Sequence, residues 1–486
     1  MNLDMLRPEI CLAVTAVAVI AVDLFCRIKW LVNITSVAGL LASICMALLL
    51  IGNSEQSIGN GLFILDNYAI YFKLLFLGIA LLVILASTDY VKRLPKLHGE
   101  FHALLLTATL GAMLTAAAHD IIAMLLSIEL TAISLYALVA MLKNTKSNES
   151  AVKYILLGAV NSAVLLFGLA LIFGFSGSTS FTTIAAAVST IQVGNIADHA
   201  GLLFGLVLTL AGFAFKIAAV PFHMWAPDVY EGAPTPITLF LSTVSKIAGL
   251  SILMRFMLTA FIQTDSLINN LGIILAIVSA LTMTAGNLIA ITQHNIKRLL
   301  AYSSIAQSGY MLIVVAVAAI GLHSAASISN LLYYLVAFAI AEVAVFSVII
   351  IASRNADMDD ISDYAGLAKR SPLLACAMTL GLLSLMGLPP LAGFMGKFFV
   401  FSQAAQNGLL WLVLIAVVNS VISAYYYLKI VRTIWMDAPA SADAVKTSLA
   451  PKLALLISCT GILLLGILPA LLNKAAEWGS FLALWN

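Results

Sequence analysis

Residues 201–227 read GLLFGLVLTLAGFAFKIAAVPFHMWAP, an apolar run that holds a single lysine and ends in a proline-containing segment. About 20 apolar residues span the hydrocarbon core of a membrane as a helix. A charge at that depth costs roughly 2.5–3.5 kcal/mol, so Lys216 is expected to serve a function. Pro221 has no backbone N–H and interrupts a helix. The stretch therefore predicts an interrupted membrane helix with a charged group near its break.

The rest of the chain is also rich in apolar residues and poor in charged ones. Of its 486 residues, 62% are hydrophobic and 9% are charged, whereas soluble domains carry about 25% charged residues. We therefore predict an all-α polytopic membrane protein. It has no nucleotide-binding motif and no cysteine spacing typical of zinc or Fe–S sites. We expect about fourteen spanning helices, at roughly 9–27, 31–51, 68–87, 101–117, 120–141, 154–175, 202–221, 235–260, 271–291, 299–320, 329–352, 373–400, 409–433 and 453–472.

The distribution of positive charge predicts the orientation of these helices. Most of the 24 lysines and arginines lie in or beside the loops after odd-numbered helices, and the loops after helices 2, 4, 6, 8, 10 and 12 hold none. Because cytoplasmic loops are rich in Lys and Arg, we expect both termini on the outer side. The loop at 221–236 lacks both residue types and holds four prolines, which indicates a docked segment.

A weak internal repeat divides the chain. His119-Asp120-Ile121 opens helix 5 and His294-Asn295-Ile296 precedes helix 10, five helices later. Because five is odd, the second copy is expected to be inverted, as in many transporters with ion sites on interrupted helices. Helices 7 and 12 are expected to be interrupted. The predicted units are 1–100 with three helices, 101–262 with helices 4–8, 267–436 with helices 9–13, and 437–486 with a loop and the last helix.

Four charged residues, Glu129, Lys216, Lys246 and Lys397, lie inside apolar segments or at their breaks. An opposite charge nearby favours the charged forms of both partners, so we expect Glu129 to pair with Lys216. If the pair opens, the lysine loses its counter-ion and can pass on a proton. The alternative is a static ion pair that stabilises packing. For Lys397, the alternative is snorkelling to the membrane surface.

Several polar residues near these charges are candidate relays. His223 follows the break in helix 7 and titrates near neutral pH, although it can instead fix the loop. Helix 10 carries Ser303, Ser304, Gln307 and Tyr310. Their side chains can support a water chain, and the alternative is hydrogen bonding between helices.

Other charged residues have simpler interpretations. Glu342 lies in the middle of helix 11 without an evident partner. Lys73 and Arg255 lie nearer helix ends, where snorkelling explains them. The acidic residues before helix 12 lack the pattern of a calcium loop and are interpreted as a solvated or subunit-facing surface: Asp357, Asp359, Asp360 and Asp363.

Two motifs, VPFHMWAPDVYEGAPTP at 220–236 and NIKRLLAYSSIAQSGY at 295–310, resemble the antiporter-like membrane subunits of respiratory complex I. These subunits share a fourteen-helix core with Mrp cation/proton antiporters. The DVYEGAP wording most resembles the N-type subunits. The family often has histidine where this chain has Gln307, which cannot titrate. The resemblance assigns the family's charged positions to Glu129, Lys216, Lys246, Lys297 and Lys397.

The resemblance implies a proton-translocating subunit of NADH:quinone oxidoreductase in the bacterial inner membrane. It implies partners among neighbouring antiporter-like and small membrane subunits, with FMN, Fe–S clusters and quinone in other subunits and no nucleic acid. Glu129 and Lys216 would open and close, Lys246 would store or relay the proton, and Lys397 would lie on the exit branch. The alternatives are an Mrp-type antiporter subunit, a membrane-arm subunit of a related hydrogenase complex and a structural spacer.

Overall fold

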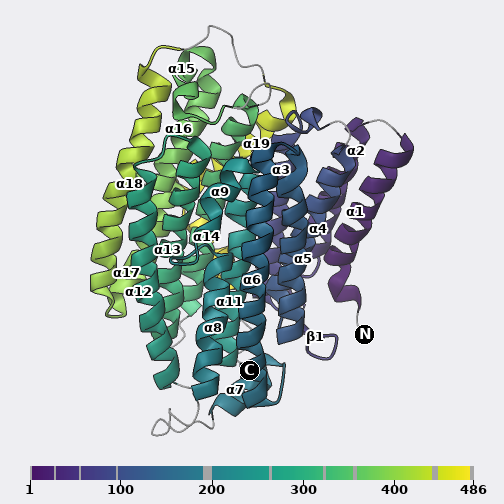
Figure 1. Cartoon of the computed structure of the whole chain (residues 1–486), viewed down its shortest axis with the longest axis vertical. Coiled ribbons are helices and arrows are strands. Elements are labelled where there is room, and N and C mark those ends of the chain that lie inside the picture. The colour runs from purple at the N-terminus through teal and green to yellow at the C-terminus, as the bar shows by residue number, and fades with distance from the viewer. Residues whose placement is uncertain are drawn as a thin grey trace.

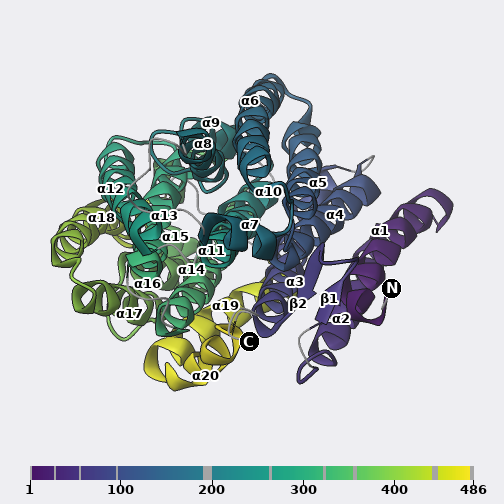
Figure 2. The ribbon, with the colours of Figure 1, turned by 90° about the horizontal axis from the view of Figure 1, so that it is seen from below.

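The computed structural model of the chain describes residues 3–26, 29–53, 56–94, 97–189, 200–261, 265–320, 325–353, 358–439 and 447–481. Its long helices stand side by side and run roughly along the vertical axis of Figure 1. Seen along that axis in Figure 2, α1 and α2 lie at one edge of the bundle, and α12, α17 and α18 lie at the opposite edge.

The predicted all-α class is confirmed, with one small hairpin added. The apolar pattern of the sequence did not predict that hairpin or the short helices α7 and α20. The elements in chain order are α1 (Arg7–Cys26), α2 (Lys29–Leu48), β1 (Gln56–Ile58), β2 (Phe63–Leu65), α3 (Asn67–Ser87), α4 (His98–Ala117), α5 (Ile121–Val139), α6 (Thr145–Ser176), α7 (Phe181–Ser189), α8 (Ala200–Lys216), α9 (Trp225–Gly232), α10 (Thr235–Phe240), a π-helical turn (Leu241–Ser245), α11 (Lys246–Ala260), α12 (Asp265–Ala290), α13 (Ile296–Ile320), α14 (Ala325–Ala352), α15 (Leu367–Arg370), α16 (Pro372–Met386), α17 (Ala392–Gln406), α18 (Leu410–Met436), α19 (Leu449–Ile467) and α20 (Ala470–Gly479).

Within the described residues, twelve helical segments are long and apolar enough to cross a membrane. The two shorter apolar helices, α8 and α16, belong to the two segments that were expected to be interrupted. Each predicted segment thus coincides with a helix or with a broken helix. Fourteen crossings of the membrane remain a prediction.

The two breaks are built differently. After α8, the chain turns through Ala218, which has a φ of 56°, and α9 then docks under the turn through a 3.0 Å hydrogen bond from Trp225 Nε1 to Phe215 O. After α16, Gly387 has a φ of 90°, and a Cβ there would lie 3.1 Å from Lys397 Cδ. The left-handed backbone therefore favours glycine at 387, and a Cβ there would also press on the Lys397 side chain.

The two copies of the repeated motif make corresponding contacts. The Asp120 side chain accepts a 2.7 Å hydrogen bond from Ile122 N at the start of α5, and the Asn295 side chain accepts one of 3.0 Å from Arg298 N at the start of α13. Each also forms an isolated β-bridge, Asp120 with Ser180 and Asn295 with Asp360. These contacts support the repeat, while its inversion and the predicted unit boundaries remain predictions.

Two buried ion pairs fix α3 in the bundle. Lys73 Nζ lies 2.7 Å from Glu9 Oε1 of α1, and both side chains are buried. Arg255 of α11 donates to both carboxylate oxygens of Asp66, at 2.8 Å each, and both side chains are fully buried. The expectation that Lys73 and Arg255 snorkel is therefore wrong. Each has a carboxylate partner that is distant in the sequence.

Candidate functional site

The first part of the candidate site joins a glutamate and a lysine. Glu129 lies in the middle of α5, and Lys216 is the last residue of α8. Glu129 Oε1 lies 3.6 Å from Lys216 Nζ and accepts a 2.6 Å hydrogen bond from the Ser162 hydroxyl. The carbonyl end of a helix favours a cation, so the break after Lys216 places this charge favourably. The contact is longer than the 2.7 Å pair of Lys73 and Glu9, and a small movement separates the two charges.

A small cavity adjoins Lys216 on the side of α11. Its volume is about 20 Å³, and its lining includes Thr131, Tyr154 and Ser245. A water molecule needs about 10–15 Å³ measured in this way, so the cavity can admit one. Ser245 ends the π-helical turn and directly precedes Lys246. The cavity therefore lies between Lys216 and the backbone segment that carries Lys246.

Lys246 occupies the middle of the bundle. Its Nζ donates a 2.7 Å hydrogen bond to the Ser304 hydroxyl and lies 5.7 Å from the centroid of the Tyr230 ring. The π-helical turn before it is a feature that occurs often at functional sites. His223 interacts electrostatically with Lys246, and its buried Nδ1 has no hydrogen-bond partner among the described residues.

Helix α13 presents a second polar group on a different side. The Ser303 hydroxyl is hydrogen-bonded to the Tyr427 hydroxyl of α18. Gln307 Nε2 donates to Leu385 O at 3.0 Å and to the Tyr427 hydroxyl at 3.4 Å, and Gln307 Oε1 accepts from the Tyr334 hydroxyl. Gln307 is therefore held on both sides of its amide, where it can orient hydroxyl groups but cannot itself accept a proton near neutral pH.

Lys397 lies at the second break. Its Nζ donates to Leu385 O at 2.9 Å, to Met386 O at 3.0 Å and to the Ser420 hydroxyl at 3.3 Å. It also lies 4.7 Å from the centroid of the Tyr310 ring. The side chain is 4% exposed, so snorkelling does not explain it. The carbonyl end of α16 therefore holds the ammonium group, and a cation is favoured at that end of a helix.

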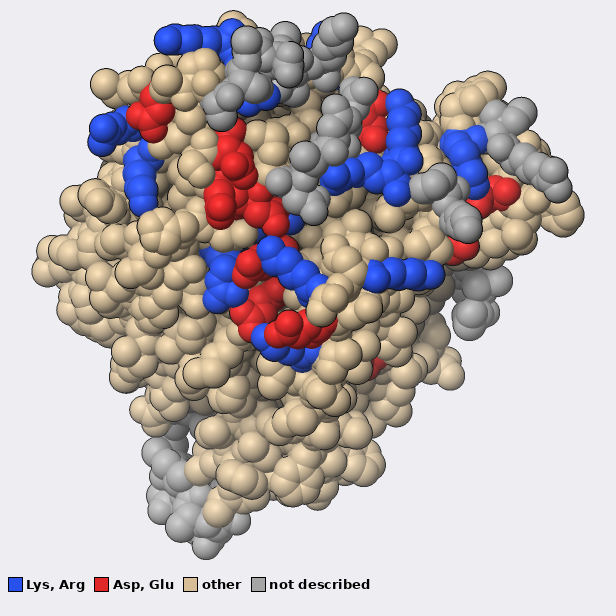
Figure 3. Space-filling model, turned by 45° about the horizontal axis from the view of Figure 1, so that its top comes forward, with Lys and Arg blue, Asp and Glu red and all other residues tan. Residues whose placement is uncertain are grey.

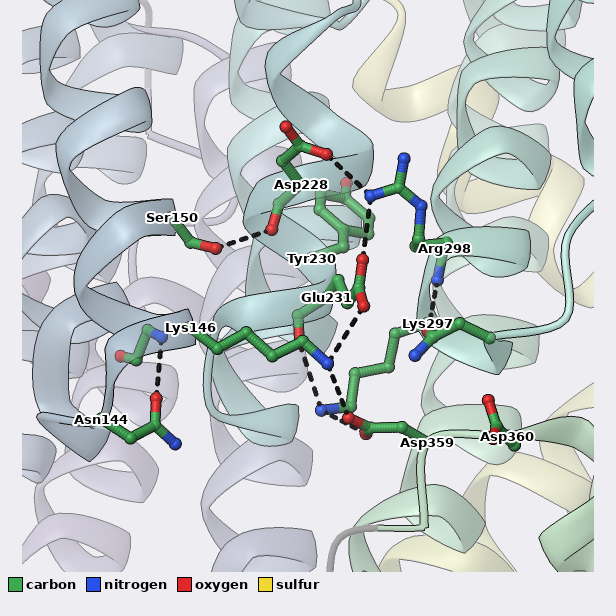
Figure 4. A network of polar contacts seen from close by, with 12 residues as sticks. Asn144, Lys146, Ser150, Asp228, Tyr230, Glu231, Lys297, Arg298, Asp359 and Asp360 are labelled. Carbon is green, nitrogen blue, oxygen red and sulfur yellow. Dashed lines mark hydrogen bonds and ion pairs between the residues drawn. The ribbon is translucent and has the colours of Figure 1, made fainter.

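A separate network of ion pairs lies away from these residues, where α6, α9 and α13 meet the segment before α15 (Figure 4). Its contacts are Lys297–Asp359 at 2.8 Å, Lys146–Asp359 at 3.1 Å, Lys146–Glu231 at 3.0 Å, Arg298–Glu231 at 2.8 Å, Arg298–Asp228 at 2.7 Å and Lys153–Asp228 at 2.8 Å.

This network adds partners to residues that the sequence singled out. Asp359, whose side chain is 21% exposed, pairs with two lysines, and Asp360 and Asp363 form a capping box at a short 3₁₀ helix. Asp357 lies outside the described residues. Lys297, a candidate relay from the resemblance, is held in this network, whereas Ser304 and Gln307 lie in the polar contacts between Lys246 and Lys397.

The network predicts a loss of stability in acid. Burial acts to raise the pKa of Asp359, but its ion pairs with Lys297 and Lys146 outweigh burial and hold that pKa below its ordinary value. A lowered pKa stabilises the fold above the unfolded value, which is about 4, and this contribution is lost as the pH falls through the folded value. Asp359→Asn should therefore cost about 1 kcal/mol at pH 7, as expected for partly exposed pairs.

The measurement is the melting temperature of the solubilised protein, in its native assembly, for the parent and Asp359→Asn between pH 7 and pH 3. We expect the difference between them to shrink once the pH falls below about 4. A difference that stays constant over this range would show that the Asp359 charge contributes nothing. Asp363→Asn is the matched control, because it neutralises a capping carboxylate that has no ion pair among the described residues.

Part of this series of polar contacts was not predicted from the sequence. Tyr427 and Ser420 on α18 contact Gln307 and Lys397 respectively. A signal for them was present, because Ser420, Ser423 and Tyr427 recur at helical spacing on one face. The side chains of Leu385 and Met386 give no indication that their backbone carbonyl oxygens accept hydrogen bonds from Lys397.

Comparison with known proteins gives one consistent family. The family described as "NADH:quinone oxidoreductase/Mrp antiporter, TM" matches residues 118–423. A protein of Dehalococcoides mccartyi named NADH-quinone oxidoreductase subunit N is 44% identical over 98% of this chain and 99% of its own length.

Solved structures agree in fold. A chain in respiratory complex I from Thermus thermophilus with bound aureothin is 32% identical, with a TM-score of 0.81 over 96% of this chain and 98% of that chain. A chain in the Mrp complex from Dietzia sp. DQ12-45-1b is 19% identical, with a TM-score of 0.83 over 99% of this chain and 97% of that chain. The second likeness concerns the fold alone.

Proposed function

The chain belongs to the membrane-subunit family of NADH:quinone oxidoreductases and Mrp antiporters, and from this premise we propose that it is a proton-translocating membrane subunit of an NADH:quinone oxidoreductase. The observation that carries the proposal is the series of charged side chains held in polar contacts inside the bundle, from Glu129 and Lys216 through Lys246 to Lys397. Buried ionisable residues in membrane proteins characteristically mark proton pathways.

In the proposed mechanism, this chain moves protons and other subunits perform the redox chemistry. Separation of Glu129 from Lys216 removes the counter-ion of the lysine, and the released proton passes toward Lys246 through the cavity beside Lys216. Lys246 holds the proton at the Ser304 hydroxyl, and Lys397 serves the exit branch. FMN, Fe–S clusters and quinone belong to other subunits of the complex.

The proposed setting is the bacterial inner membrane, beside neighbouring antiporter-like and small membrane subunits. The acidic and basic side chains gather on the upper face (Figure 3), and α1 begins in the lower half of Figure 1. Because positive charge is enriched on the cytoplasmic side, we assign the upper face to the cytoplasm and both termini to the periplasm.

The relatives favour this function over an Mrp-type antiporter. The Dehalococcoides mccartyi relative named for the oxidoreductase is 44% identical over almost the whole chain, and the Mrp chain is 19% identical. Identity in the second comparison is too low to indicate more than a shared fold.

Purification through an affinity tag on this chain tests the proposal. We expect quinone-reducing and Fe–S subunits to co-purify, and we expect the complex in proteoliposomes to acidify one side when it oxidises NADH. Omission of quinone is the control. Co-purification with antiporter subunits alone, together with sodium-driven proton movement that needs no NADH, would contradict it.

A further inference from the structure

Glu342 is a buried carboxylate that the mechanism above does not use. It lies in the middle of α14 and is 0% exposed. Neither of its oxygens has a hydrogen bond of full geometry among the described residues, although the Ser242 hydroxyl, which donates to Leu239 O at 2.9 Å, lies close enough to act on the carboxyl group. A buried charge without a hydrogen bond is costly, so this carboxyl group needs either a cation or a proton.

The cation that acts on Glu342 is Lys246, which interacts with it electrostatically without a direct contact of 4 Å or less among the described ion pairs. The carboxyl group also interacts electrostatically with the hydroxyls of Tyr230 and Tyr427. The Lys246 ammonium group lies over the Tyr230 ring, and the Tyr427 hydroxyl is hydrogen-bonded to the Ser303 hydroxyl. Glu342 therefore lies within electrostatic range of both polar groups that α13 separates.

Helix α13 separates the polar contacts of Lys246 from those of Tyr427, so a proton passing from Lys246 to Lys397 needs a group that links the two sides. Ser304 binds Lys246, while Ser303 and Gln307 bind Tyr427. Successive residues turn by about 100° around a helix, so Ser303 and Ser304 face different directions. Gln307, on the side of Lys397, cannot carry a proton. The two lysines thus have no carboxylate, imidazole or amine between them on α13, where the proton-bearing side chains are hydroxyl groups, including that of Tyr310 beside Lys397.

We propose that Glu342 supplies this group and receives a proton from Lys246 on its way to Lys397. The inference rests on the proposed function. In the step, an N–H bond of the Lys246 ammonium breaks and an O–H bond forms on Glu342, through the Ser304 hydroxyl or a water molecule. A neutral amine and a neutral acid replace two buried charges, which a medium of low dielectric favours. The acid then passes its proton, along hydroxyl groups and water, to the neutral amine of Lys397.

The test compares Glu342→Gln with Ser347→Ala in the assembled complex in proteoliposomes. Ser347 lies on the same helix, and its buried hydroxyl is also without a hydrogen bond among the described residues. We expect Glu342→Gln to slow NADH-driven pumping about tenfold or more, because a positioned proton-transfer group contributes about 10²–10⁴-fold. Ser347→Ala should pump like the parent.

A second variant tests the link itself. The double variant Glu342→Gln with Gln307→His places a titrating group on α13, and it should pump at least severalfold faster than Glu342→Gln alone. Lys216→Ala serves as the reference for the proposed function. If Lys216→Ala is defective while Glu342→Gln pumps like the parent, the inference about Glu342 is wrong and the proposed function stands. If both pump like the parent, the proposed function fails as well.

Glu342→Asp covers the case in which the glutamine variant does not assemble. It keeps the carboxyl group, and the infrared difference spectrum between turning-over and resting complex should show a carboxylic acid band that shifts from its position in the parent. An unshifted band would mean that the signal comes from another carboxyl group and would overturn the inference.

Discussion

Replacing Lys216 with alanine is expected to lower NADH-driven proton pumping about tenfold or more, because a positioned proton-transfer group contributes about 10²–10⁴-fold to a rate. The complex should remain assembled, since Lys216 makes one 3.6 Å ion pair and ends a helix. Pumping in proteoliposomes, expressed as protons moved per NADH oxidised, is the measurement. Lys474→Ala removes an exposed lysine from α20 and is the matched control.

Lys216→Arg separates a proton switch from a static ion pair. Arginine keeps the positive charge and can still pair with Glu129, but its guanidinium does not give up a proton in proteins. A switch predicts that Lys216→Arg is as defective as Lys216→Ala. A static pair predicts that it pumps like the parent. Parent-like pumping by both variants would exclude any role for this lysine in proton transfer.

The largest effect on stability is expected for Asp66→Asn. Removing one partner of a buried ion pair costs about 3–5 kcal/mol, because the other charge remains buried without compensation. Arg255 would lose its partner while staying between α3 and α4, where its Nε donates to Ala116 O at 2.9 Å. Asp66 also accepts a 2.7 Å hydrogen bond from Ala69 N at the start of α3.

The measurement is the melting temperature of the solubilised complex, together with the amount of this chain in the membrane. Asp4→Asn is the matched control, because its 2.8 Å pair with Arg7 is exposed and such pairs contribute only about 0–1 kcal/mol. A double variant, Asp66→Leu with Arg255→Met, should recover much of the loss, since apolar replacement of a whole buried pair is often tolerated. Equal melting of Asp66→Asn and Asp4→Asn would show that the buried pair contributes little.

Local properties of the chain predicted most of the fold. Apolar length predicted the helices, and the missing backbone N–H of Pro221 marked the first of the two breaks. The rarity of charge in apolar segments singled out Glu129 and Lys216, which the structure brings to within 3.6 Å.

Partners distant in the sequence could not be predicted in the same way. Arg255 and Asp66 are 189 positions apart, and nothing in either segment indicates the other, so both the pair and the burial of Arg255 were missed. The hairpin of β1 and β2 has three residues in each strand, too few for an alternating pattern to be recognised. Glu342 was identified as unusual, but its relation to Lys246 and Tyr427 depends on how α14 packs.

At Lys397, the number of N–H bonds on the side chain must match the number of acceptor oxygens around it. An ammonium group has three N–H bonds, and the structure provides three acceptors, two of them carbonyl oxygens in the last turn of α16. A neutral amine has only two N–H bonds and a lone pair, so it can still donate to both carbonyl oxygens but no longer to Ser420. The Ser420 hydroxyl now donates to Met386 O at 3.2 Å, and because a hydroxyl can donate as well as accept, it can turn its O–H toward the lone pair. If Lys397 gives up a proton as we propose, Ser420 changes from acceptor to donor in the same event, so a side chain of α18 reports the protonation state of a lysine on α17.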